Sequence, residues 1–100
     1  MGYAITIQAD KKEYGWGEKV KVTGHLLEDG KGVSSEIRLV KNDEWAKTTT
    51  SQPNGFYLFE DVAKPSGRIT YSVNAPIKPG VEARSEEVAI NVKEKAIWQR

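Results

Sequence analysis

Hydrophobic and polar residues alternate along most of the chain, and helical periodicity is almost absent. The clearest case is the segment 19–26, in which Val20, Val22 and Leu26 fall on one side and polar residues on the other. Such alternation is typical of a β-strand with one buried face. The pattern predicts strands over residues 3–8, 19–26, 36–41, 45–50, 56–59, 68–73 and 86–93.

Short segments rich in Gly, Pro, Asn and Asp separate these strands. These residues favour turns because they tolerate backbone angles that other residues avoid. About seven short strands, with turns roughly every 8–12 residues, predict an all-β, two-layer antiparallel sandwich. The predicted turns and loops cover residues 28–32, 42–43, 52–55, 65–67 and 76–80.

The charged residues exclude several classes of partner. Fifteen basic and 14 acidic residues are mixed along the chain and leave a net charge of +1. Such a surface attracts neither nucleic acid nor an anionic membrane, and the apolar stretches are too short to span a bilayer. The chain has no Cys, which excludes disulfides, a thiolate nucleophile and Cys-ligated metal sites.

No group of residues indicates catalysis. His25 is the single histidine and lies on the polar side of its strand, and no nucleophile motif or phosphate-binding glycine loop is present. Neighbouring carboxylates such as Asp43 and Glu44 cannot work as one acid–base pair by spacing alone, because adjacent strand residues point to opposite faces. Lys21 and Asn91 have the residue types of a covalent cross-link, but both should face solvent. We predict no enzyme, no cofactor and no metal, with calcium an option only at loop carboxylates between domains.

Two sequence motifs suggest a family. Tyr14-x-x-Gly17-x-x-Val20-x-Val22-x-Gly24 resembles the opening of bacterial and archaeal immunoglobulin-like repeats. The segments 54–59 and 67–73 resemble their later part, with a turn Gly, a short aromatic strand and a Tyr-containing strand. The resemblance covers residues 4–93 and implies an immunoglobulin-like β-sandwich. Carboxypeptidase-regulatory-like and fibronectin type III domains share much of this pattern.

The resemblance also sets the register of the aromatic strand. In the related repeats the second and fourth residues after the Gly face inward, which places Tyr57 and Phe59 in the core and Phe56 and Leu58 outside. The complete predicted core is Ile5, Ile7, Val20, Val22, Leu26, Ile37, Leu39, Tyr57, Phe59, Ile69, Tyr71, Val73, Val88 and Ile90.

The resemblance implies a non-catalytic structural or adhesive module, a spacer or interaction repeat of a larger microbial surface or secreted protein. Its expected partners are neighbouring domains of the same chain or other surface proteins, and the isolated domain should be a monomer. The alternative is a carbohydrate-binding module, because exposed Trp rings can stack on sugars. The candidate binding residues are Trp16, Trp45 and Trp98, although large aromatic residues more often pack in a core or at its rim.

The sequence predicts one domain over residues 1–93 and a tail over 94–100. The alternation stops in the tail, which suggests a linker or a helical turn docked through Ile97 and Trp98. No signal peptide is visible at Met1, and the lack of Cys weakly favours the cytosol. The family resemblance instead implies an extracellular or cell-surface location, which is our prediction.

Overall fold

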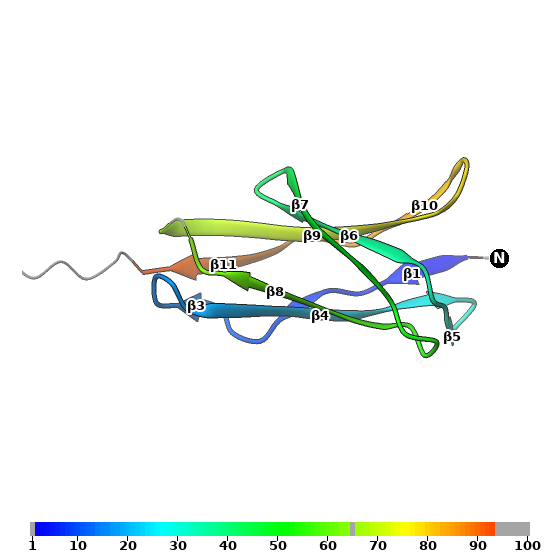
Figure 1. Ribbon diagram of the computed structural model, residues 1–100, viewed down its shortest axis with the longest axis horizontal. Coiled ribbons are helices and arrows are strands. Elements are labelled where there is room, and N and C mark those ends of the chain that lie inside the picture. The colour runs from blue at the N-terminus through cyan, green and yellow to red at the C-terminus, as the bar shows by residue number, and fades with distance from the viewer. Residues whose placement is uncertain (1, 65, 94–100) are drawn as a thin grey trace, which may run out of the picture.

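The computed structural model describes residues 2–64 and 66–93, and these form a two-layer β-sandwich (Figure 1). The first layer is organised around the long strand β4, which pairs with β8 on one edge and with β1 and β2 on the other. The strands of this layer are β1 (Tyr3–Ile5), β2 (Gln8–Ala9), β4 (Lys19–Glu28), β5 (Lys31–Gly32) and β8 (Phe56–Val62).

The second layer follows the order β3-β11-β9-β6-β7, and β10 also pairs with β9. All of its pairs are antiparallel except β3 with β11, which run parallel. Its strands are β3 (Glu13–Tyr14), β6 (Glu36–Lys41), β7 (Glu44–Thr50), β9 (Gly67–Lys78), β10 (Val81–Arg84) and β11 (Val88–Val92).

The first and last described strands lead to opposite ends of the sandwich. Figure 1 shows the start of β1 at one end and the end of β11 at the other. The N-terminal segment leaves the first layer at β3 and pairs there with β11, through Asn91 opposite Glu13 and Val92 opposite Tyr14. The chain therefore enters the fold at one end and leaves it at the other. Before it leaves, β11 pairs side by side with β3, which follows the first two strands.

The core lies between the two layers and agrees closely with the alternation of the sequence. Twelve of the predicted core residues are buried, and Tyr57 and Phe59 face inward while Leu58 is 42% exposed, which confirms the predicted register. Ile7 and Val88 are only partly buried, because Ile7 lies in the gap between two short strands and Val88 is the first residue of β11. Buried hydrophobic residues absent from the predicted list are Tyr14, Ala63, Ala75, Ala83 and Val92.

The predicted first strand, 3–8, is broken at Thr6 and Ile7. The Tyr57 hydroxyl donates a hydrogen bond to the Thr6 carbonyl, while the Thr6 side-chain oxygen accepts one from the His25 amide at 2.9 Å. Gly24 makes this kink feasible, because a Cβ there would lie 1.9 Å from the Thr6 carbonyl oxygen. The interruption depends on a contact between residues 51 positions apart in the sequence, so local alternation could not predict it.

The predicted loop 76–80 is wrong over most of its length, because β9 continues to Lys78 and turns directly into β10. Pro76 is tolerated in β9 because it lies beyond Asn74, the last residue there that pairs with β6. A proline at such a position has no ladder hydrogen bond to lose on that edge. The part of the chain that the structure describes thus has eleven strands, several of them very short, where the sequence predicted about seven.

Candidate functional site

Trp45 is the most exposed large hydrophobic side chain in the described part of the chain, at 66%. It lies on the edge strand β7, next to the two-residue turn formed by Asn42 and Asp43, both of which have positive φ. The β6–β7 register shifts by one residue after Leu39, so that Leu39 pairs with Lys47 but Val40 pairs with Trp45. The extra residue, Ala46, is a β-bulge, and it brings Trp45 beside Val40 on the outer face of the second layer.

A groove lies beside Trp45 on this outer face. It consists of two hollows of about 360 and 310 Å³ that share Val40 and Asn74. We call their lining the Trp45 groove; it comprises Glu36, Arg38, Val40, Asp43, Trp45, Thr48, Ser72, Val73, Asn74, Glu82, Arg84, Ser85 and Glu87.

The strand register arranges the groove in rows. One row runs Thr48–Arg38–Asn74–Arg84 across β7, β6, β9 and β10, each residue directly opposite the next. A second row is formed by Trp45, Val40 and Ser72. Because the two rows lie two residues apart along the strands, they are separated by about 7 Å.

Two ion pairs hold the polar side chains of the groove. Arg38 Nε lies 2.7 Å from a Glu36 carboxylate oxygen, and Arg84 Nε lies 2.6 Å from a Glu82 carboxylate oxygen. Both pairs join residues two apart on one strand, which point to the same face. Each Arg uses only Nε in its ion pair, so its terminal nitrogens remain available as donors.

Asn74, at the centre of the polar row, has an unusual environment. Its side-chain oxygen is buried and has no hydrogen-bond donor among the described residues. A buried acceptor without a partner costs about 1–3 kcal/mol. A donor supplied from outside the protein would relieve that cost.

The other two candidate Trp residues do not join Trp45. Trp16 is 36% exposed, and the Lys64 ammonium group lies 4.8 Å from its ring centroid. Its loop is tied down by hydrogen bonds from Gly17 N to Ala63 O at 2.9 Å and from Ala63 N to Glu18 O at 2.8 Å. Trp16 therefore packs at the junction of β3 and β4 and does not line the Trp45 groove. Trp98, together with the rest of the tail 94–100, lies outside the described residues.

The groups considered for chemistry are dispersed. His25 is exposed on the outer face of the first layer, where its ring packs edge-on against Phe56 at a centroid distance of 5.5 Å. Lys21 is exposed in the first layer and Asn91 in the second, so the cross-link considered from sequence has no geometric basis. No group of three or more His, Cys, Asp or Glu residues within residues 2–64 and 66–93 is placed to hold a metal ion.

A partly buried polar cluster connects the two layers at another position. Asp61 of β8 accepts hydrogen bonds from Lys41 Nζ at 2.8 Å and from the Tyr71 hydroxyl at 2.7 Å. Burial alone would raise the pKa of Asp61, but these two hydrogen bonds, together with one from the Val62 backbone and the charge of Lys41, outweigh it and hold the pKa below its ordinary value. Burial and the neighbouring Asp61 raise the pKa of Tyr71, so Tyr71 remains a donor at all ordinary pH values. This cluster fastens one layer to the other.

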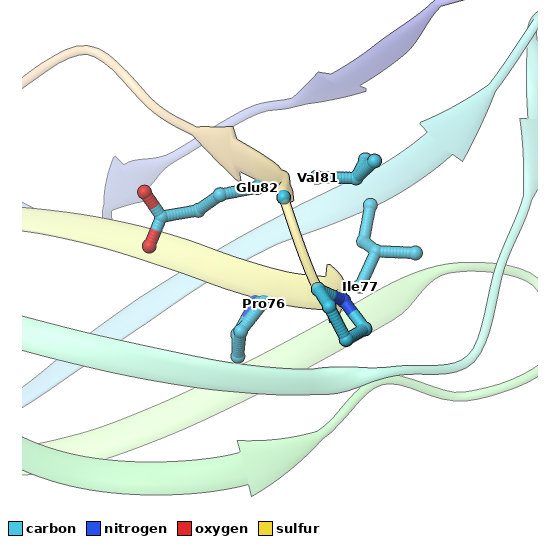
Figure 2. A pocket seen from close by; sticks show the side chains of 6 residues that line it. Pro76, Ile77, Val81 and Glu82 are labelled. Atoms are coloured by element: carbon cyan, nitrogen blue, oxygen red, sulfur yellow. The ribbon is translucent and has the colours of Figure 1, made fainter.

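Another hollow, of about 690 Å³, is a less suitable site. It lies at the hairpin between β9 and β10, where Pro76, Ile77 and Val81 surround it and Glu82 extends away from the two aliphatic side chains (Figure 2). Glu82 is the one charged side chain described in its lining, so little there could orient a polar ligand.

The chain has no match among family models or curated proteins. It does resemble solved structures. Fibronectin(III)-like modules of Clostridium thermocellum CbhA match 93% of this chain and 99% of their own, with 16% identity and a TM-score of 0.72. The CARDB domain of a Pyrococcus furiosus protein, solved in complex with di-metal ions, matches 91% of this chain and 87% of its own, with 14% identity and a TM-score of 0.66.

A third similar structure is Spo0M, a sporulation control protein of Bacillus subtilis. It matches 93% of this chain but only 50% of its own length, with 20% identity and a TM-score of 0.53. No helix in the described residues is long and apolar enough to cross a membrane. At these identities the similarity concerns architecture, and by its architecture this chain is an immunoglobulin-like, fibronectin(III)-like β-sandwich.

Proposed function

We propose that this chain is a non-catalytic module of a larger microbial extracellular protein, in which it holds neighbouring segments apart. The observation that carries the proposal is the position of its ends, because a chain that enters at one end of a sandwich and leaves at the other separates whatever it joins (Figure 1). The similarity to fibronectin(III)-like modules of CbhA, over 93% of this chain, supports the same role. The tail 94–100 would then act as the linker to a following segment.

The pairing of the terminal segments suits a module under tension. Asn91 N donates to Lys12 O at 2.8 Å, and Lys93 N donates to Tyr14 O at 2.9 Å, so β3 is joined to the last residues of β11. Because these strands are parallel and the chain ends lie at opposite ends, a pull on both ends loads these hydrogen bonds together and along the strand direction. The partly buried cluster of Lys41, Asp61 and Tyr71 adds a second connection between the layers.

The test is the shape of two copies of the full chain joined in tandem. If the module is a spacer, small-angle scattering should give an elongated particle, and each copy should unfold with the midpoint of the single domain. One copy has a radius of gyration of 15.1 Å, so two copies end to end should give about twice that value, whereas two copies folded back side by side would give only a few ångströms more than one copy. A measured value only slightly above that of the single domain would show that the two copies fold back on each other, and the spacer proposal would be wrong.

Carbohydrate binding is the second candidate function, and the exposure of Trp45 above a polar groove favours it. It is compatible with a spacer role because the Trp45 groove lies on a sheet face, away from the chain ends.

A further inference from the structure

We propose that the Trp45 groove binds a neutral carbohydrate, with one sugar ring stacked on Trp45 and its hydroxyl groups held by the row Arg38–Asn74–Arg84. This inference rests on the second candidate function, carbohydrate binding, for which it names the ligand class and the residues, and it does not depend on the spacer role. Three independent features of the groove carry it: an exposed aromatic platform, a buried acceptor without a donor, and a row of polar groups whose two Arg side chains are each paired with a Glu.

The platform is the side chain of Trp45, which the β-bulge at Ala46 brings to the outer face. An exposed indole ring offers a flat apolar surface with little conformational entropy to lose. The face of a pyranose that carries axial C–H groups is equally flat and apolar. Val40 lies directly opposite Trp45 in the register and extends the same apolar shelf into the sheet.

The polar row supplies the partners that hydroxyl groups need. The Asn74 oxygen lacks a donor and is covered in the unliganded domain, and once the Asn74 side chain turns toward the groove a hydroxyl group can donate to it while accepting from a neighbouring group. Arg38 and Arg84 lie opposite Asn74 on either side, and their free terminal nitrogens are donors. Two hydroxyls on adjacent ring carbons can thus bond to Asn74 and to one Arg at the same time.

The charges of the groove favour a neutral ligand over a charged one. Its four carboxylates (Glu36, Asp43, Glu82, Glu87) face two guanidinium groups, which leaves a net charge of −2. This excess opposes phosphates, sulfates and uronic acids. Both Arg residues are already paired with Glu36 or Glu82, so neither is available as an isolated anion site.

The test is a titration of the full chain, labelled with ¹⁵N and followed by NMR. The probes are cellohexaose, xylohexaose, mannohexaose and laminarihexaose, with a heparin hexasaccharide and hexalysine as the anionic and cationic comparators. We expect at least one neutral probe to shift the Trp45 indole and Asn74 amide signals saturably, with a Kd on the order of 0.1–1 mM. The Trp16 indole signal should stay in place because Trp16 does not line the groove.

Three variants separate binding from folding. Trp45→Ala should weaken binding at least about tenfold and remain folded, because its side chain is mostly exposed. Asn74→Leu should weaken binding about fivefold or more, whereas its unfolding midpoint should stay level or rise because an unpaired acceptor is removed. Trp16→Ala, the matched control, should bind as the parent does.

The proposal is wrong if no neutral probe moves both signals at about 10 mM, well above the expected Kd. It is equally wrong if Trp45→Ala binds like the parent, or if heparin hexasaccharide or hexalysine binds the groove more tightly than every neutral probe. None of these outcomes affects the tandem scattering experiment, so the spacer role and the binding role stand or fall separately.

Discussion

Replacing Lys41 by Met should destabilise the domain strongly at neutral pH and much less in acid. Lys41 and Asp61 have side chains only 19% and 13% exposed, so their ion pair is closer to a buried pair than to a surface pair. Removing one partner of a buried pair costs about 3–5 kcal/mol, and an exposed pair contributes about 0–1 kcal/mol. With some solvent screening, we expect Lys41→Met to cost about 2–3 kcal/mol at neutral pH.

The pH dependence follows from the lowered pKa of Asp61. A carboxyl group whose pKa is lower in the folded state stabilises the fold above its unfolded pKa, about 3.9, and this contribution is lost as the pH falls through the folded value. In Lys41→Met the cation that lowers the pKa is gone, and burial favours the protonated acid instead. Protonation of Asp61 then removes its unpaired buried charge. The difference in the free energy of unfolding between the variant and the parent should therefore become smaller as the pH falls.

Urea unfolding followed by tryptophan fluorescence at about pH 7 and about pH 3, on either side of the ordinary carboxyl pKa, measures both quantities. The double variant Lys41→Met/Asp61→Leu should recover part of the lost stability, because it removes both charges together but leaves the Tyr71 hydroxyl without its acceptor. A loss below about 0.5 kcal/mol at neutral pH, or a loss equal at both pH values, would show that the pair is screened like an ordinary surface pair.

Three further substitutions test the backbone geometry, with Tyr57→Phe as the control for Gly24→Ala. Gly24→Ala should cost about 2–4 kcal/mol, because its Cβ would lie 1.9 Å from the Thr6 carbonyl oxygen and 2.5 Å from the Tyr57 hydroxyl. Tyr57→Phe removes only the hydroxyl and should cost about 1 kcal/mol; equal losses for the two variants in urea unfolding would contradict the steric explanation. Asp43→Gly should stabilise the β6–β7 turn by about 0.5–1 kcal/mol, because Asp43 has a φ of 67°, where glycine is favoured. A lower unfolding midpoint for this variant would mean that the Asp43 side chain contributes more than the strain it carries.

The alternation of the sequence predicted the layers of the fold because the apolar residues of each strand lie on its buried face and the polar residues on its exposed face. It gave the third strand, 36–41, with its observed bounds, and it placed Tyr57 and Phe59 in the core. Alternation says nothing about contacts between distant segments. The kink at Thr6 and the passage of β9 through Pro76 depend on such contacts, so both were missed.

The candidate site also depends on contacts between distant segments, which alternation cannot predict. Trp45 was one of three candidate binding residues, but strict alternation gives no warning of the bulge at Ala46 that aims it outward. Arg38, Asn74 and Arg84 form one row only because β6, β9 and β10 meet in a particular register. That register is set by the packing of the core on the opposite face of the sheet, and no spacing in the sequence reveals it.

Strand β9 links the core to the proposed binding face. Its buried residues Tyr71, Val73 and Ala75 alternate with Ser72 and Asn74, which line the groove, so core packing fixes the position of the groove. A site built on such a strand is preorganised, and a bound sugar should shift signals of the second layer while leaving the first layer unchanged. Because the ligand binds only the folded domain, a neutral hexasaccharide at about ten times its Kd should raise the free energy of unfolding by about 1.4 kcal/mol. The Trp45→Ala domain should lose this stabilisation, because the platform for the sugar ring is absent although the strand beneath it is intact.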